Sequence, residues 1–167
     1  EYGNNGTAPN SPLENATGKY YGAKEFDGSN DYITVPTSVS LSPRNNLTVS
    51  AWVKATKDTA GADYNNRGPL GKWVSTNQYI LWTNVGNGLN YEFTVMSSGG
   101  RSDADAGAAV RDNNWHHIVG IWDGASRIYV DGALVASGTY RGGTLDSGSG
   151  SFSIGDYQNA AGSTFFP

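Results

Sequence analysis

Three oxygen-bearing side chains occur close together near the start of the chain. Asp27, Asn30 and Asp31 surround Gly28, which permits a tight turn. Carboxylate and amide oxygens are the ligands that Ca²⁺ prefers, so this segment predicts a calcium site. The same residue types also favour turns without any ion, in which case Asp31 serves as a structural partner within the loop. The sequence leaves both interpretations open.

Paired acids that could hydrolyse a glycosidic bond are not evident in the sequence. A retaining glycosidase needs two carboxylates a short distance apart, often on one strand face. Glu92 stands alone in its predicted strand, and Glu1, Glu14 and Glu25 are not paired in that way either. The chain also lacks a G-x-S-x-G elbow, an HExxH motif and a P-loop. We therefore predict that the domain is not an enzyme.

The two histidines, His116 and His117, are adjacent in a predicted strand. Adjacent strand residues point to opposite faces, so the two rings cannot chelate one metal ion together. We expect one ring to be buried and hydrogen-bonded, and the other to face the second layer or solvent. The sequence contains no cysteine, which excludes disulfides, thiolate zinc sites and a cysteine nucleophile.

Charge and hydropathy argue against two classes of partner. The 167 residues include 11 basic and 15 acidic side chains, giving a net charge of −4. This charge has the wrong sign for a protein that binds a phosphate backbone, so we expect no nucleic acid partner. No apolar run approaches the roughly 18 residues needed to cross a bilayer, so we expect no membrane insertion. A cysteine-free chain rich in Gly, Ser, Thr and Asn is common among exported proteins, which predicts an extracellular or cell-surface location.

Short alternating segments between turn signals indicate an all-β fold. Residues 47–54 alternate between apolar and mainly polar side chains, and residues 88–96 do the same. Asp131-Gly132 lies between two apolar runs and predicts a type I′ hairpin turn, because both central residues need positive φ. No long stretch has a convincing 3.6-residue period. We therefore expect almost no helix and two antiparallel sheets packed face to face.

Polar loops and exposed aromatic rings are where such a sandwich is expected to bind a ligand. The segments 55–68 and 97–114 are polar and are predicted to be surface loops. Aromatic rings suit sugars because the CH face of a pyranose packs on them. Those in or beside polar segments are Tyr64, Trp73, Tyr140 and Tyr157. Tryptophans within predicted strands are expected in the core, namely Trp52, Trp82, Trp115 and Trp122.

Four motifs follow one another in the order and spacing of a known family. Phe26–Pro36 resembles the FDG-x-x-DYV-x-V opening of bacterial laminin-G-like jelly-roll domains, and Leu47–Lys54 looks like their LTVSAWVK strand. Trp115–Gly120 resembles their WHHVAG strand, and Tyr129–Val135 matches their YVDG-x-LV hairpin, with Ile154-Gly155 after it. The resemblance implies a two-sheet antiparallel jelly-roll sandwich of the concanavalin A-like superfamily.

The same resemblance implies where ligands bind. In laminin-G-like domains the loop that matches residues 27–31 often binds Ca²⁺ with an acid from the C-terminal strand. In pentraxins, which share the sandwich, the loop at the position of Asp156 carries calcium ligands on the glycan-binding face. The predicted metal ligands are therefore Asp27, Asn30, Asp31 and Asp156. The predicted ligand-binding residues are Asn77, Gln78, Tyr157, Gln158 and Asn159. The amides of Asn77, Gln78, Gln158 and Asn159 would form a hydrogen-bonding rim for sugar hydroxyls.

The family also implies a C-terminal strand that lies in the middle of a sheet. Its members usually end with G-x-IDEVRIYNRALS, which does not occur here. We therefore expect residues 1–18 to form an irregular polar lead-in and residues 19–167 to form a sandwich lacking that strand. A cut chain, a longer parent protein and a strand supplied by another chain are all open explanations. A vacant slot would expose backbone donors and acceptors as a strand-addition site.

These features predict a non-catalytic carbohydrate-binding or adhesion module of an exported or cell-surface protein. Loops at one edge of the sandwich would bind a glycan or a cell-surface ligand, with Ca²⁺ as a structural or bridging ion. The alternative is a structural subunit or decoration of an extracellular filament or surface assembly. Glycan binding would support the first prediction, and self-assembly of the isolated chain would support the second.

Overall fold

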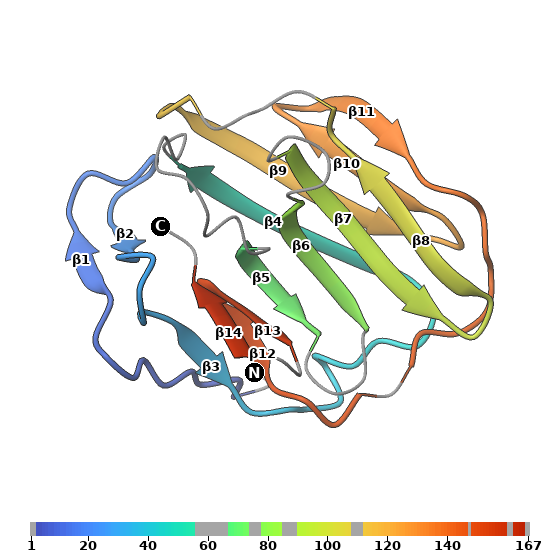
Figure 1. Cartoon of the computed structure of the whole chain (residues 1–167), viewed down its shortest axis with the longest axis horizontal. Helices are drawn as coiled ribbons and strands as arrows, with labels where there is room; N and C mark the ends of the chain where they lie inside the picture. Colours follow the sequence, from blue (N-terminus) through green and yellow to red (C-terminus); the bar gives the residue numbers. More distant parts are fainter. Residues whose placement is uncertain are drawn as a thin grey trace.

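Two antiparallel sheets form the body of the protein (Figure 1). The computed structural model describes residues 3–55, 67–73, 78–84, 90–107, 112–146, 148–159 and 162–165, without the side chains of residues 67, 84, 157–159 and 162–165. These described residues contain no helix, and hence no helical segment that could cross a membrane. The predicted all-β sandwich is confirmed.

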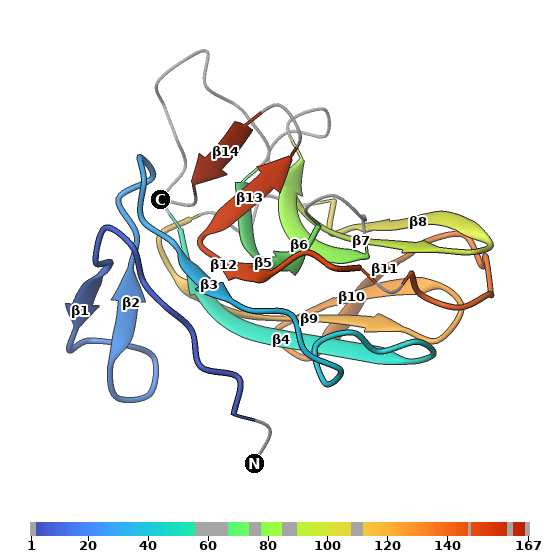
Figure 2. The same ribbon diagram turned by 90° about the horizontal axis from the view of Figure 1, so that it is seen from below.

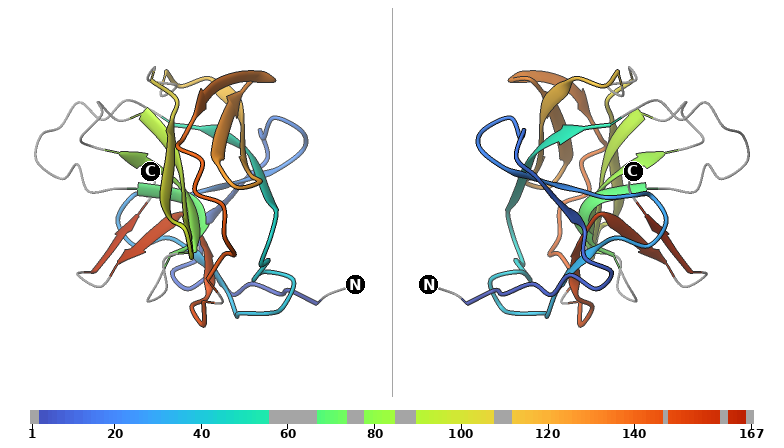
Figure 3. Two further views of the ribbon diagram at one scale, coloured as in Figure 1. Left: turned by 90° about the vertical axis from the view of Figure 1, so that its right-hand side faces the viewer. Right: turned by 90° about the vertical axis from the view of Figure 1, so that its left-hand side faces the viewer.

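The larger sheet has six strands and the smaller has four. In spatial order the six are β3 (Ile33–Val35), β12 (Phe152–Ile154), β5 (Arg67–Lys72), β6 (Tyr79–Asn84), β7 (Asn90–Ser97) and β8 (Gly100–Asp105). The four are β11 (Ala133–Ser137), β10 (Ser126–Val130), β9 (Trp115–Trp122) and β4 (Leu47–Lys54). Figures 2 and 3 show the two sheets as facing layers.

Two small hairpins lie outside these layers. The first pairs β1 (Leu13–Asn15) with β2 (Ala23–Glu25), and the second pairs β13 (Asp156–Asn159) with β14 (Gly162–Phe165). Figure 2 shows the β13–β14 hairpin over the outer face of the six-stranded sheet and the β1–β2 hairpin to one side of both sheets. The stretch 1–18, expected to be irregular, thus contains one short strand.

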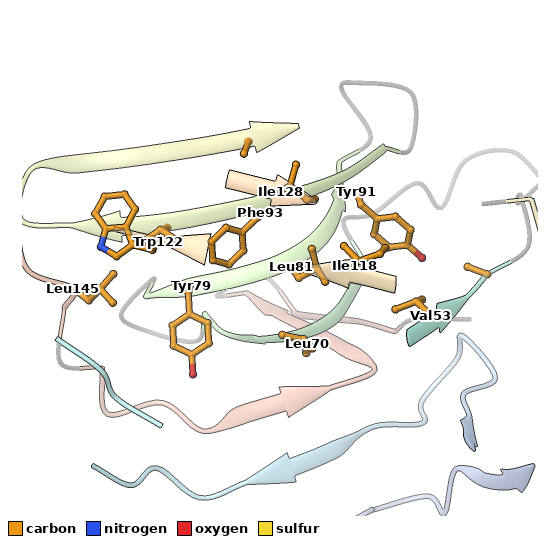
Figure 4. Close-up of a cluster of buried hydrophobic side chains, with 13 residues drawn as sticks. Val53, Leu70, Tyr79, Leu81, Tyr91, Phe93, Ile118, Trp122, Ile128 and Leu145 are labelled. Carbon is orange, nitrogen blue, oxygen red and sulfur yellow. The ribbon is translucent and has the colours of Figure 1, made fainter. Parts of the chain in front are cut away.

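The core lies between the sheets, where alternate residues of each strand face inward (Figure 4). In the β4–β9 pair, Val49 lies opposite Gly120 and Ala51 lies opposite Ile118, so the apolar face of residues 47–54 is the inward one. Gly120 leaves room for an aromatic ring of the other sheet, because a Cβ on it would lie 2.5 Å from Phe93 Cδ2. The largest fully buried apolar side chains are Trp122, Tyr91, Phe93, Ile80, Leu81, Ile118, Ile128 and Leu145.

The hairpin between β10 and β11 confirms the turn expected at Asp131-Gly132. Asp131 has φ of 50° and Gly132 has φ of 87°, as a type I′ turn requires. The turn joins Val130 directly to its partner Ala133 across the hairpin. Local turn chemistry therefore fixes this part of the smaller sheet.

The segment 97–114 was expected to be a loop, and this prediction is wrong for residues 100–105. They form β8, which pairs with β7 from Ser97↔Gly100 to Glu92↔Asp105. Its inward residues, Ser102 and Ala104, are small and buried. Ser102 hydrogen-bonds the opposite sheet instead of filling space, because Ser126 donates its N–H to Ser102 Oγ over 3.1 Å. A strand with such small inward residues has no hydrophobic alternation to reveal it.

Two of the four tryptophans expected in the core are only half-buried. Trp82 and Trp122 are buried, as predicted. Trp52 and Trp115 instead lie on the outer face of the four-stranded sheet and are partly exposed. They occupy the outward positions of β4 and β9, and the period of two decides their direction regardless of residue type. Most of the segment 55–68, also expected to be a loop, lies outside the described residues.

Candidate functional site

The loop predicted to bind calcium is closed by hydrogen bonds to its own backbone. Asp27 Oδ1 accepts the N–H groups of Ser29 at 2.8 Å, Asn30 at 3.1 Å and Asp31 at 3.4 Å. These bonds hold the pKa of the Asp27 carboxyl below its ordinary value. Asp31 is buried and its Oδ2 accepts the N–H of Asp27 at 3.2 Å. The loop is thus a well-formed turn, in which Asp31 has the structural partner that one interpretation of the sequence anticipated.

The fold brings this loop to the same corner as Asp156. The ring of Phe26, just before the loop, packs on Gly155, where a Cβ would lie 2.4 Å from Phe26 Cδ1. Gly155 has φ of 81°, which a side chain would strain. Asp156 follows it and is buried. The described residues contain no cluster of three or more His, Cys, Asp or Glu side chains able to hold a metal ion, and calcium at this corner stays a prediction.

The residues predicted to form a sugar-binding rim occupy different environments. Gln78 is fully buried, and its amide has no hydrogen-bond partner among the described residues, so it lies beneath the surface and not at a rim. Tyr157, Gln158 and Asn159 belong to β13, which pairs with β14, and their side chains lie outside the described part. Asn77 lies outside the described residues altogether, as does Tyr64. Tyr140 is exposed, as expected.

A polar cluster that the sequence did not reveal lies on the outer face of β6, β7 and β8. Trp82 Nε1 donates to Thr94 Oγ1 over 2.9 Å, and this hydroxyl lies 2.8 Å from Glu92 Oε1 and 2.7 Å from Asp103 Oδ1. Arg101 Nε lies 2.7 Å from the same Asp103 oxygen, and its Nη2 lies 3.3 Å from Glu92 Oε1. One hydroxyl and one guanidinium therefore join both carboxylates beside an indole ring.

The residues of this polar cluster (Trp82, Glu92, Thr94, Arg101 and Asp103) range from fully buried to partly exposed. The Glu92 side chain is only 3% exposed, whereas Arg101 is 43% exposed and Asp103 is 40% exposed. Arg101 also lies 5.8 Å from the centre of the Trp82 ring. Burial opposes the charge of Arg101, but its contacts with Asp103 and Glu92 raise its pKa above the ordinary value. Arg101 and Asp103 thus present a guanidinium and a carboxylate to solvent, and the buried Glu92, Thr94 and Trp82 lie beneath them.

A small aromatic group continues the same face. Trp73 is partly exposed and packs against Ile80 and Trp82, which are buried on this side of the sheet. Trp73 was one of the aromatic residues predicted to be available for sugar stacking. The outer face of the six-stranded sheet therefore combines indole rings with charged hydrogen-bonding groups, and the β13–β14 hairpin stands over the same face (Figure 2).

Register explains why sequence reasoning missed the polar cluster. Glu92 was judged to be alone because no second acid occurs in its own strand. The pairings Glu92↔Asp105 and Thr94↔Asp103 place the acids of β8 on the same face as Glu92. The alternating charges of Arg101, Asp103 and Asp105 after the Gly99-Gly100 turn are the signal that could have revealed this face.

The two histidines point to opposite faces, as predicted. His116 lies between two carboxylates, with Nδ1 2.7 Å from Asp131 Oδ2 and Nε2 3.0 Å from Asp112 Oδ1. His117 lies on the outer face, where its ring stacks on Trp52 with centroids 5.1 Å apart. They form no common site.

A family comparison agrees with the fold. The family model described as the concanavalin A-like lectin/glucanases superfamily matches residues 27–167. This chain belongs to that superfamily. The resemblance carried by the four motifs is therefore confirmed. No curated protein sequence matches the chain.

Solved structures repeat this concanavalin A-like architecture at low sequence identity. The binding domain of Paraclostridial Mosquitocidal Protein 1 has 13% identity and a TM-score of 0.75, over 98% of this chain and 43% of that one. The botulinum neurotoxin serotype G binding domain has 16% identity and a TM-score of 0.71, over 92% and 39%. Domain 4 of an extracellular arabinanase from Geobacillus stearothermophilus, solved with arabinotriose, has 20% identity and a TM-score of 0.72, over 96% and 78%. The chain spans about two fifths of the length of the first two structures.

Proposed function

We propose that this concanavalin A-like domain is a non-catalytic glycan-binding module of an exported or cell-surface protein. The glycan would bind on the outer face of the six-stranded sheet, between the polar cluster and the β13–β14 hairpin. One observation carries the proposal. Arg101 and Asp103 present charged hydrogen-bonding groups to solvent while Trp82, Thr94 and Glu92 hold them from below.

The chemistry of this face suits sugars. Hydroxyl groups of a sugar both donate and accept, so a carboxylate beside a guanidinium can bind two neighbouring hydroxyls. The half-exposed ring of Trp73 offers an apolar surface for the CH face of a pyranose. Because the polar cluster is already internally hydrogen-bonded, little side-chain freedom would be lost when a ligand binds.

The structural neighbours support a binding role at the level of fold. The arabinanase domain was solved with arabinotriose, and a botulinum neurotoxin serotype D ligand-binding domain with N-acetylneuraminic acid. The second has 16% identity to this chain and a TM-score of 0.65. Several neighbours are thus binding domains of larger proteins, and a role outside the cell is part of the proposal.

The geometry of the two acids supports binding over catalysis. Glycoside hydrolysis needs one protonated carboxylic acid to donate to the leaving oxygen. Here both acids contact one arginine, because Arg101 Nε lies 2.7 Å from Asp103 Oδ1 and its Nη2 lies 3.3 Å from Glu92 Oε1. We therefore expect no release of reducing sugar from any glycan that the domain binds.

A matched pair of arginine variants tests the proposed face. Arg101→Gln removes the charge from the polar cluster, whereas Arg127→Gln removes an arginine that pairs with Asp123 on the opposite sheet. An array of neutral and sialylated oligosaccharides that includes arabinotriose would identify a ligand, and calorimetry would measure its affinity. Arg101→Gln should weaken binding at least about tenfold, or about 1.4 kcal/mol, while Arg127→Gln leaves it unchanged. Absence of binding across the array, or equal effects of both variants, would contradict the proposal.

Calcium is a second, separable part of the proposal. We place it at the corner formed by residues 27–31 and Asp156, where it would bridge or stabilise the loop. Calcium should then raise the midpoint of thermal unfolding, and Asp27→Asn should abolish the increase because Asp27 contributes the exposed carboxylate. The control is Asp123→Asn, on the far side of the fold. An equal increase of the unfolding midpoint in wild type and Asp27→Asn would show that calcium does not bind at this corner.

A further inference from the structure

Three asparagines of this chain are each followed by a residue other than proline and then by threonine. This is the N-x-T sequon, at which exported proteins accept an N-linked oligosaccharide. The pairs are Asn5 with Thr7, Asn15 with Thr17, and Asn46 with Thr48. An N-linked oligosaccharide is bulky and polar, so the asparagine that carries it must reach solvent in the folded chain. The surroundings of each amide therefore decide which sequon the fold presents.

The amide of Asn15 is held within the β1–β2 hairpin. Its Oδ1 accepts the N–H of Thr17 at 2.8 Å and the hydroxyl of Thr17 at 2.6 Å. Its Nδ2 donates to Glu25 Oε2 over 3.0 Å, and the residue is only partly exposed. A transferase that acts on the folded chain must break these bonds, each of which contributes about 1 kcal/mol. The nitrogen that would carry the sugar and the threonine hydroxyl are therefore both engaged.

Asn46 has no such restraint. It comes directly before β4, is exposed, and has no side-chain hydrogen bond to any described residue. Thr48 is exposed in β4, and its hydroxyl likewise has no partner in the part of the chain that the structure describes. Leu47 lies between them, packs against the core and pairs with Trp122 of β9, which fixes the sequon on the smaller sheet. Both side chains that a transferase must contact are thus open to solvent.

The outer face of the four-stranded sheet beside Asn46 carries apolar side chains that are only partly buried. Thr48 lies opposite Ile121 in the β4–β9 ladder, and Val119 lies opposite Tyr129 in the β9–β10 ladder. Ile121, Val119 and Tyr129 are each partly exposed. Contiguous apolar surface of this kind marks a place where something else packs. Neighbouring strands are about 4.8 Å apart, so a saccharide attached to Asn46 can reach Ile121.

We propose that Asn46 is the attachment site of an N-linked oligosaccharide, which extends over Ile121 on the outer face of the four-stranded sheet. The donor is an oligosaccharide carried on a lipid diphosphate. Nδ2 of Asn46 forms a bond to the anomeric carbon, and the bond from that carbon to the diphosphate oxygen breaks. The lipid diphosphate leaves, and one amide proton passes to a base of the transferase. The inference rests on the export that is part of the proposed function, but it concerns the sheet opposite the proposed glycan-binding face.

Transfer to the folded chain tests the site. The whole chain with Asn5→Gln is incubated with a purified oligosaccharyltransferase and a lipid diphosphate oligosaccharide, and peptide mapping by mass spectrometry follows each asparagine. Short peptides centred on Asn15 and Asn46 give the rates without the fold. Relative to its own peptide, Asn46 in the folded chain should react at least about tenfold faster than Asn15, whose amide is hydrogen-bonded. No modification of Asn46, or equal relative rates at the two sites, would overturn the inference.

Variants of the sequon separate its chemistry from folding. Thr48→Val keeps Asn46 and suits a strand but removes the hydroxyl, so the modification should be lost, and Thr48→Ser should retain it. Asn45→Gln changes the neighbouring exposed asparagine and should have no effect. Equal modification of wild type and Thr48→Val would contradict the proposed site. Binding to the oligosaccharide array is measured separately, so failure of the proposed function and failure of this inference are distinguishable.

Hydroxyl-radical footprinting tests where the oligosaccharide lies. In the modified chain, oxidation of Ile121 should fall at least about twofold, because the sugar covers it. Tyr21 is 95% exposed between β1 and β2, and its oxidation should not change. Equal oxidation of Ile121 in the modified and unmodified chains would overturn the placement of the sugar over this sheet.

Discussion

The edge strands β8 and β4 differ in how far other parts of the chain cover them. β8 is covered by the segment that follows β11, because Ser102 Oγ donates to the Thr139 carbonyl over 2.8 Å and Arg141 Nε donates to the Arg101 carbonyl over 2.9 Å. β4 has no such cover among the described residues and faces a groove instead. Natural β proteins usually protect their edges with charges or covering segments. The groove beside β4 is lined by residues 50–54 of β4 and by residues 22–26 around β2.

The largest effect should come from the closed part of the core. Ile118→Ala removes a fully buried side chain from β9 and should lower the free energy of unfolding by about 2–5 kcal/mol. Val49→Ala, on the partly exposed β4, should lower it by only about 1 kcal/mol. Urea unfolding at equilibrium measures both. Equal losses would mean that the interior behind β4 is as closed as the rest.

Matched serines compare the two edges directly. Ser102→Ala leaves the Ser126 N–H and the Thr139 carbonyl without their partner, and should cost about 1–3 kcal/mol. Ser50→Ala removes an exposed hydroxyl of β4 that lies 2.7 Å from His117 Nε2, and should change stability by less than about 0.5 kcal/mol. Thermal and urea unfolding of both variants check the difference. A larger loss of stability from Ser50→Ala than from Ser102→Ala would contradict the difference between the two edges.

The smallest effect concerns pH at the end of β4, where Val53 pairs with His116. Burial lowers the pKa of His116, but hydrogen bonds and charges of Asp131 and Asp112 outweigh it, so the pKa is raised above 6.5. A raised histidine pKa stabilises the folded state fully below the unfolded value, and this stability is lost as pH rises through the folded pKa. The free energy of unfolding should therefore fall by about 1 kcal/mol or less from pH 5.5 to pH 9.

His116→Gln provides the control for this titration. It retains hydrogen-bonding capacity toward Asp131 and Asp112 but carries no charge, so the fall above pH 6.5 should disappear. The remaining pH dependence then belongs to other groups. An identical fall in wild type and His116→Gln would show that the ion pairs seen at His116 contribute nothing to folding.

Alternation and turn chemistry made much of the fold predictable. The alternation of residues 47–54 predicted a strand and Asp131-Gly132 predicted the hairpin turn, and both are confirmed because both signals are local. β8 was missed because its inward residues, Ser102 and Ala104, are small, and the opposite sheet meets them through hydrogen bonds. Trp52 was assigned to the core by residue type, although its own alternation pointed outward.

The candidate site was harder to predict because it depends on pairing between strands. Asp103 joins Glu92 only through the β7–β8 register, and the alternating charges of β8 indicate a strand without fixing its pairing with β7. The loop of residues 27–31 was visible because its residues are neighbours in sequence, and its pairing with Asp156 as predicted metal ligands came from the family resemblance. The groove beside β4 follows from what lies next to an edge, and this is a property of the folded chain alone.

Hydrogen exchange of the free protein tests the contrast between the two edges most directly. Exchange should be slow at the β8 amides that pair with β7, and the segment after β11 should also slow the others by packing on Arg101 and Ser102. Alternate amides of β4 between Leu47 and Lys54 should exchange much faster, because they point toward the groove and not toward β9. Protection of all β4 amides of the monomer to the level of β8 would contradict the account.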